Sequence, residues 1–148
     1  MKRRSARVFI QNKDGLYLAL FQINFGKYVL PGGKCEPGES FIDCVIRETK
    51  EETNLILKNI ALIYEYRWPK EQKIINQTDG FDQNYYIADA DLSELKIMEP
   101  NKHSEYKFLT LEHISLYQNK GYQEIKSKLN NYKKRFVAFA KTTGHSAR

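Results

Sequence analysis

The chain has few of the residues that bind zinc or form disulfides. It contains two cysteines, Cys35 and Cys44, nine positions apart, and three histidines, His103, His113 and His145. This cysteine spacing is typical neither of a zinc finger nor of a disulfide framework, and the histidines form no spaced set with the cysteines. We therefore expect two free, reduced cysteines and no zinc site, so that oxygen atoms would hold any metal ion.

A long apolar run is also absent. No segment of the sequence resembles a transmembrane span. The N-terminus is basic over residues 2–4, but the apolar run after it is short and is interrupted by the polar residues 11–14, so the sequence does not predict a signal peptide. On these grounds we expect a cytoplasmic protein with no membrane association.

The composition is that of an ordinary globular protein. Hydrophobic residues make up 41% and charged residues 28% of the chain, which excludes an intrinsically disordered protein. A length of 148 residues suits one compact domain better than two small, marginal ones. We therefore predict a single domain over residues 1–148, with residues 141–148 as a frayed tail. The net charge of +6 favours a polyanionic partner, but only as a tendency.

The hydrophobic pattern predicts both strands and helices. Asp14 and Gly15 lie between the apolar runs 6–11 and 16–21, an arrangement typical of a β-hairpin. The other expected elements are strands at residues 28–30, 57–67, 83–89 and 105–109, a polar loop at 68–82, a loop at 32–38 too rich in glycine and proline to be helix or sheet, and a long amphipathic helix at 122–140.

Another helix is predicted directly after the glycine-rich loop. Ser40 is a candidate N-cap, and Asp43 three residues later approximates a capping box. The helix is expected to run to about Thr53. Asn54 then stands where a left-handed residue commonly ends a helix.

Three glutamates fall on one edge of this helix. At about 100° per residue, Glu48, Glu51 and Glu52 lie within an arc of roughly 100° beside the apolar stripe. Like charges at these spacings repel one another and destabilise a helix. A divalent cation reverses that effect, since Mg²⁺ and Mn²⁺ prefer hard oxygen ligands. The alternative interpretation is a solvated acidic surface, which such runs commonly form.

The residues around these glutamates favour the cation-binding interpretation. Gly33 is followed after five residues by Glu39, and after seven more by the segment 47–55, which reads Arg-Glu-Thr-Lys-Glu-Glu-Thr-Asn-Leu. This pattern closely resembles the Nudix box, with every charged position at the family's spacing. Asn54 departs from the usual glycine and Thr49 from the usual apolar residue. Asparagine tolerates a left-handed helix end, and threonine can bury its methyl group, so we expect the site to survive both.

The resemblance to Nudix proteins implies a fold and a cofactor. The implied fold is an α/β protein, an α/β/α sandwich with a mixed β-sheet, and the implied cofactor is Mg²⁺ or Mn²⁺. In this family pattern the metal ligands would be the backbone carbonyl of Gly33 and the side chains of Glu48, Glu51 and Glu52.

The resemblance also implies catalytic roles. Arg47 and Glu39 would brace the glycine-rich loop against the helix. Either Glu52 or Glu51 would act as the general base. In many family members a further glutamate outside the box binds the metal or serves as the base, and Glu105 best matches that position; the alternative for Glu105 is an exposed charge on a strand.

Segments outside the box bear on the substrate. Residues 66–70 and 80–87 resemble the branch of the family with bacterial RNA 5′-pyrophosphohydrolases and diadenosine polyphosphate hydrolases. Residues 31–34 instead resemble MutT-like enzymes that act on oxidised nucleoside triphosphates. The residues expected to stack on a base or contact phosphates are Arg3, Arg4, Arg7, Tyr28, Lys34, Trp68, Gln83 and Tyr85. For each aromatic residue the alternative is a place in the core or at a loop end.

We therefore predict a Nudix pyrophosphohydrolase that splits a diphosphate linkage in a nucleotide compound, preferably a dinucleoside polyphosphate or an RNA 5′ end. One alternative is MutT-like hydrolysis of nucleoside triphosphates to monophosphate and pyrophosphate. A second is a non-catalytic, nucleotide-binding Nudix module, which the intact glutamate set disfavours. The sequence contains no readable RNA-recognition or DNA-binding motif.

Overall fold

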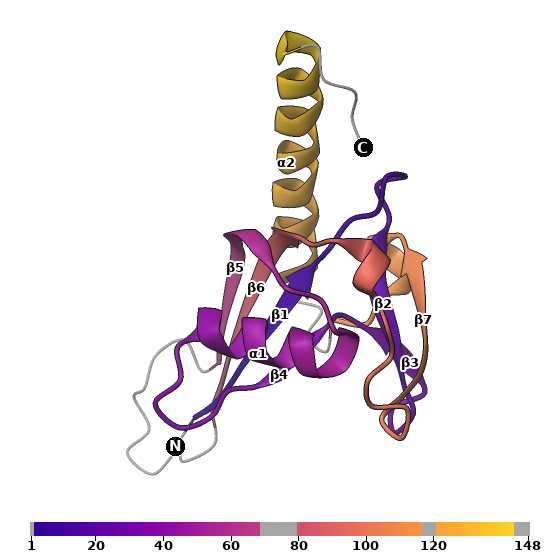
Figure 1. Cartoon of the computed structure of the whole chain (residues 1–148). Helices are drawn as coiled ribbons and strands as arrows, with labels where there is room; N and C mark the ends of the chain where they lie inside the picture. Colours follow the sequence, from indigo (N-terminus) through magenta and orange to yellow (C-terminus); the bar gives the residue numbers. More distant parts are fainter. Residues whose placement is uncertain (1, 69–79, 117–120, 144–148) are drawn as a thin grey trace.

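The fold is described by a computed structural model that covers residues 2–68, 80–116 and 121–143, with residues 133–143 as backbone only (Figure 1). The elements are the strands β1 (Arg3–Phe9), β2 (Tyr17–Gln22), β3 (Lys27–Val29), β4 (Gly32–Lys34), β5 (Lys58–Trp68), β6 (Phe81–Asp89) and β7 (His103–Leu109), the helices α1 (Phe41–Thr53) and α2 (Tyr122–Thr143), and the short 3₁₀ turns η1 (Leu92–Glu94) and η2 (Leu111–His113).

The strands form two sheets. One has the order β4-β1-β6-β5 and the other the order β3-β2-β7. β1 runs parallel to β6, while β1 and β4, and also β5 and β6, are antiparallel, so the larger sheet is mixed. Figure 1 shows α1 crossing one face of this sheet, while α2 extends well beyond the strands.

Alternating side chains of β1 divide the core into two layers. Val8 packs in a buried cluster with Val45 of α1 on one face of the sheet. Phe9 packs on the other face in a cluster that includes Ile125 of α2. Because side chains one position apart point to opposite faces of a strand, helices cover both faces. The predicted α/β/α sandwich with a mixed sheet is confirmed.

The predicted hairpin over residues 6–21 is wrong, because its two strands belong to different sheets. β1 is paired along both edges, with β4 and β6, so no edge remains for β2. The chain does turn tightly at Gly15, where φ is +78°. The two segments still meet near the turn, where the Leu18 N–H donates to the Ile10 carbonyl at 2.9 Å and the rings of Phe9 and Tyr17 pack edge to face.

The prediction that residues 32–38 contain no strand is also wrong, because β4 pairs with β1. Gly32 makes this close approach possible. A Cβ atom at Gly32 would lie 2.0 Å from the Ala6 carbonyl oxygen, and the φ of +136° is one that other residues rarely adopt. Glycine therefore marks a site of backbone contact here rather than an irregular loop.

Helix α1 begins and ends as the sequence predicts. The Ser40 side chain accepts a hydrogen bond from the Asp43 N–H at 3.1 Å. Asn54 has a φ of +65°, and its N–H donates to the Lys50 carbonyl at 3.0 Å. Thr49, at 0% exposure, is fully buried against the sheet. Asn54 therefore ends the helix in place of the usual glycine. Thr49 occupies a buried position of the helix in place of the usual apolar residue.

The remaining strands start and end close to their predicted bounds. β6 begins at Phe81 and β7 at His103, each two residues before the predicted start. Helix α2 extends to Thr143, so the predicted tail at 141–148 starts inside it, and residues 144–148 lie outside the described part. The middle of the predicted polar loop, residues 69–79, lies outside it as well. Of the helices described, none combines the length and apolar character that crossing a membrane requires.

Candidate active site

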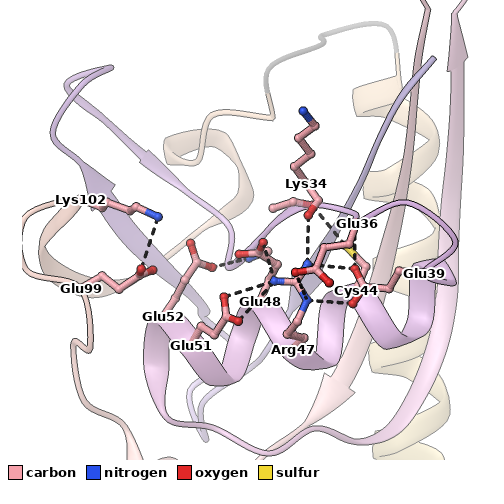
Figure 2. Close-up of polar contacts among 12 residues, drawn as sticks. Lys34, Glu36, Glu39, Cys44, Arg47, Glu48, Glu51, Glu52, Glu99 and Lys102 are labelled. Atoms are coloured by element: carbon pink, nitrogen blue, oxygen red, sulfur yellow. Dashed lines mark hydrogen bonds and ion pairs between the residues drawn. The ribbon is translucent and has the colours of Figure 1, made fainter. Parts of the chain in front are cut away.

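The three glutamates predicted to share one edge of α1 do so (Figure 2). Their side chains differ in exposure, at 7% for Glu52, 19% for Glu48 and 51% for Glu51. A solvated acidic face would leave all three carboxylates in water. The partial burial of two of them therefore favours a binding site over a surface charge cluster.

Glu52 is the most deeply buried of the three. Its Oε1 accepts a hydrogen bond from the Gly32 N–H at 2.8 Å. Burial raises the pKa of Glu52 to about 8, against the opposing influences of the positive charge of Arg7 and of this hydrogen bond. A carboxylate in this position lacks a full set of charge partners, which a cation would supply.

Glu48 lies directly against Gly33. A Cβ atom at Gly33 would lie 2.8 Å from the Cδ and Oε2 atoms of Glu48, so the carboxylate occupies the space that a side chain would need. Burial raises the pKa of Glu48, and the charge of Arg47 acts against that rise. The Gly33 carbonyl, a predicted metal ligand, accepts a hydrogen bond from the Cys44 thiol at 3.4 Å.

Arg47 connects the loop to the helix, in agreement with its predicted position. Its Nε and Nη2 donate to the two carboxylate oxygens of Glu39 at 2.8 and 2.9 Å. Nη2 also donates to the Lys34 carbonyl at 3.1 Å, and Nη1 to Glu48 at 3.1 Å. The hydrogen bonds from Arg47 lower the pKa of Glu39 to about 2. The paired side chains thus fix the loop backbone beside the glutamates (Figure 2).

Two of the arginines predicted to bind phosphate donate hydrogen bonds to backbone carbonyls around the loop. Arg4 donates from Nη1 to the Glu39 carbonyl at 2.7 Å. Arg7 donates from Nη1 to the carbonyls of Leu30 and Gly32 at 2.9 and 3.1 Å. Both side chains therefore support the backbone around the site.

The other predicted substrate contacts lie in different surroundings. Arg3 and Lys34 are exposed, and Trp68 is 46% exposed at the end of β5. Gln83 and Tyr85, at 1% and 2% exposure, are buried in the core. The Gln83 amide donates to the Tyr85 hydroxyl, which donates to the Leu116 carbonyl at 2.8 Å. Their burial supports the alternative of core residues over base stacking.

Glu105 is exposed on β7, where it accepts a hydrogen bond from the hydroxyl of Tyr28 at 2.9 Å. The carboxylate that the structure brings to Glu52 from outside the box is instead Glu99. Ligand atoms of Glu52, Glu99 and His103 all lie within 4.8 Å of one another. Neither Glu99 nor His103 was predicted as a site residue; their four-residue spacing just before a strand was the only signal in the sequence.

The two cysteines are free, as predicted, and both are buried. Together with Glu39, they offer ligand atoms within 4.8 Å of one another. Both oxygens of Glu39 are already engaged by Arg47. This cluster therefore supports the loop, and oxygen atoms dominate the group around α1.

The donor atoms around α1 fit a divalent cation. Glu48, Glu51 and Glu52 lie along one edge of α1, and Glu99 from the segment before β7 lies beside Glu52; Mg²⁺ and Mn²⁺ prefer such oxygen ligands. Burial is the main cause of the raised pKa of Glu52, and the negative charges of Glu48 and Glu99 add to it. The class of protein defined by this fold and site is an α/β protein with a carboxylate site suited to metal-assisted phosphate chemistry.

Comparison with known proteins identifies the family. The family described as "NUDIX domain" matches residues 1–129, so the chain belongs to the Nudix family of hydrolases, as its sequence pattern predicts. Among curated proteins it is 26% identical over 124 residues to an RNA pyrophosphohydrolase of Erythrobacter litoralis, covering 72% of this chain and 75% of that protein. It is also 26% identical over 105 residues to the asymmetrical bis(5′-nucleosyl)-tetraphosphatase of Mus musculus, covering 71% of this chain and 64% of that enzyme.

Other relatives match over shorter stretches. The chain spans 29% of the length of the NAD-capped RNA hydrolase NudC of Pseudomonas putida, at 29% identity over 89 residues. Among solved structures, a MutT NUDIX hydrolase from Burkholderia pseudomallei has a TM-score of 0.65 at 21% identity, covering 86% of this chain and 98% of that one. This structural likeness confirms the fold.

Proposed function

We propose that this Nudix hydrolase splits a diphosphate linkage in a nucleotide compound with the help of Mg²⁺ or Mn²⁺, and that its substrate is an RNA 5′ end or a dinucleoside polyphosphate. The observation that carries the proposal is the position of two partly desolvated carboxylates against the Gly32-Gly33 backbone, with Glu48 against Gly33 and Glu52 on the N–H of Gly32. A divalent cation and a diphosphate together supply the opposite charges that this arrangement needs.

The metal ligands are assigned from the box and from the fold. The Gly33 carbonyl, Glu48, Glu51 and Glu52 would hold the cation, and Glu99 joins them because its carboxylate lies near Glu52. When bound, the cation neutralises the diphosphate charge and lowers the pKa of a water molecule. Glu105 stays a candidate ligand or base from the sequence, although Glu99 lies closer to the box in the structure.

The protein's own side chains perform the remaining steps. Glu52 or Glu51 accepts the proton of the attacking water, because the Gly32 N–H uses only one oxygen of Glu52 and the Glu51 side chain is 51% exposed. Arg47 holds the loop and the helix in one arrangement through Glu39, so that Glu48 stays beside Gly33. Exact positioning of this kind accounts for much of the rate in phosphoryl chemistry.

The proposed substrate class has support in the chain and in its relatives. Arg3 and Lys34 are exposed basic residues near the loop, suited to phosphates, and Trp68 offers a partly exposed ring to a base. Two relatives that each match about 70% of this chain are an RNA pyrophosphohydrolase and a bis(5′-nucleosyl)-tetraphosphatase. Both names refer to a phosphate chain attached to a nucleoside.

A screen of phosphate products tests the proposal. The full chain with Mg²⁺ is offered triphosphorylated short RNA, diadenosine tetraphosphate, oxidised dGTP, ADP-ribose and nucleotide sugars. We expect turnover of one of the first two. The variant Glu52→Gln should lose about three orders of magnitude in turnover, while Glu94→Gln, which changes an exposed glutamate of η1, should retain it. Turnover of ADP-ribose or sugar nucleotides alone would make the substrate class wrong.

MutT-like hydrolysis of oxidised nucleoside triphosphates is the second candidate. It is favoured by a 34% identity over 67 residues to the putative 8-oxo-dGTP diphosphatase YtkD of Bacillus subtilis, which covers 45% of this chain and 39% of that protein. In the same screen this candidate predicts pyrophosphate release from oxidised dGTP. Binding without turnover of any compound would indicate the third possibility, a non-catalytic module.

A further inference from the structure

A buried histidine lies beside the carboxylates of the site. His103 is 3% exposed, and its Nε2 lies 3.4 Å from Oε2 of Glu52. Its other ring nitrogen, Nδ1, has no hydrogen-bond partner among the residues that the structure describes. In a neutral imidazole one nitrogen carries the proton and the other a lone pair, so Nε2, which faces Glu52, is placed to bind a cation.

Backbone hydrogen bonds hold His103 and Glu99 in this place. The His103 N–H donates to the Glu99 carbonyl at 3.0 Å, closing a turn that directs both side chains toward α1. The Met98 N–H donates to the Glu52 carbonyl at 3.1 Å, which fixes the turn to the end of that helix. Strand pairing of His103 with Gln22 anchors the other side. The imidazole is therefore positioned by two neighbouring elements.

We propose that His103 is a nitrogen ligand of a divalent cation held between Glu52 and Glu99, and that it makes this site favour first-row transition-metal ions over Mg²⁺. This inference rests on the proposed function, because it concerns a cation in the same site. It adds a ligand of a different chemical class, since the box supplies only oxygen.

The geometry suits such a cation. Ligands at about 2.1 Å from an ion lie up to about 4.2 Å apart, and the atoms of the three side chains here lie within 4.8 Å of one another. Side-chain shifts of well under 1 Å therefore bring them to bonding distance. Lys102 pairs with Oε2 of Glu99 at 3.3 Å, and the second oxygen of that carboxylate serves the cation.

The chemistry of the ligands explains the selectivity. Mg²⁺ prefers oxygen atoms and water, whereas imidazole binds transition ions more strongly, with affinity rising from Mn²⁺ toward Cu²⁺. A single imidazole among carboxylates should therefore leave Mg²⁺ binding nearly unchanged and add affinity for Mn²⁺ and the ions after it.

Pulsed electron paramagnetic resonance of bound Mn²⁺ tests this directly, because a directly bound imidazole nitrogen couples to the electron spin. The full chain, without a histidine tag, is loaded with Mn²⁺. We expect a ¹⁴N coupling that changes to a ¹⁵N coupling when the protein is made with ¹⁵N-histidine. This isotopic substitution needs no mutation, so the result does not depend on a variant that folds.

Variants assign the coupling to one residue. His103→Gln should lose the nitrogen coupling, and the dissociation constant for Mn²⁺ measured by calorimetry should rise about tenfold or more, while that for Mg²⁺ changes less than about threefold. His113→Gln, which alters an exposed histidine of η2, should change neither quantity. Mn²⁺ bound to the wild-type protein without nitrogen coupling would overturn the inference and leave the proposed function standing. No Mn²⁺ binding at all would overturn both.

Discussion

Arg47 holds Glu39 with two parallel hydrogen bonds, from Nε to Oε2 at 2.8 Å and from Nη2 to Oε1 at 2.9 Å. This planar pairing joins the middle of α1 to the end of the glycine-rich loop. A guanidinium group makes such a two-point contact, and an ammonium group does not. The geometry of the proposed metal ligands therefore depends on a residue that is not one of them.

Replacing Arg47 with lysine should reduce turnover about 100-fold, because the loop carbonyl of Gly33 loses its fixed position relative to the helix. Initial rates with Mg²⁺ and the substrate identified in the screen measure this. Lys50→Arg changes an exposed residue of the same helix and should leave the rate unchanged. An Arg47→Lys enzyme as fast as the wild type would show that the brace has no part in catalysis.

Replacing Gly33 with alanine should weaken Mn²⁺ binding about 10- to 100-fold. The added Cβ would lie 2.8 Å from the Glu48 carboxylate, which has to move away from its place beside the loop. Calorimetric titration with Mn²⁺ gives the affinity. Gly26→Asn is the control, since Gly26 has a φ of +63° that asparagine tolerates and no atom lies within 4 Å of a Cβ there. Unchanged affinity in Gly33→Ala would argue against Glu48 as a ligand.

The stability of the metal-free protein should fall as the pH rises from about 5 to about 8. Burial raises the pKa of Glu52 to about 8, so the folded state binds this proton more tightly than the unfolded chain does. The resulting stabilisation is fully present below the unfolded pKa and is lost as the pH passes through the folded one.

Thermal midpoints in the presence of a chelator, compared between the wild type and Glu52→Gln, measure this contribution. Added Mg²⁺ should stabilise the wild type increasingly across the same range, because the cation binds the deprotonated carboxylate. If the thermal midpoints of the wild type and the variant changed with pH in the same way, the assignment of this effect to Glu52 would be contradicted.

The two cysteines should resist alkylation in the folded protein. Cys44 is 0% and Cys35 7% exposed, and burial raises the pKa of both thiols, which disfavours the reactive thiolate. Mass spectrometry after iodoacetamide should find no modification in the native state and two per chain after unfolding. Ser104→Cys, at an exposed position of β7, provides a thiol that reacts in the folded state. Rapid native modification of Cys44 would show that the loop opens.

The local part of the site could be predicted from the sequence. The capped ends of α1 and the angular positions of Glu48, Glu51 and Glu52 follow from residue types and helical periodicity within a short segment. The pairing of Arg47 with Glu39 came instead from the resemblance to the Nudix box. These contacts depend on few residues between the partners, so a sequence pattern contains them.

The long-range part could not be predicted. Glu99 and His103 reach Glu52 only because β7 pairs with β2 and because the Met98 N–H binds the Glu52 carbonyl. Neither contact leaves a periodic pattern in the sequence. The hydrophobic pattern also identified the strand that contains Gln83 and Tyr85. Both faces of its sheet are covered, so the alternation of apolar and polar residues does not distinguish a buried side chain from one that faces a substrate.

The central claim is that the glutamates of α1 bind a divalent cation together with a nucleotide phosphate. Anomalous diffraction from crystals grown with Mn²⁺ and a non-hydrolysable substrate analogue tests it most directly. We predict an anomalous peak at bonding distance from carboxylate oxygens of Glu48 and Glu52, with a phosphate oxygen of the analogue as a further ligand. Bound analogue with no peak beside these glutamates would contradict the claim.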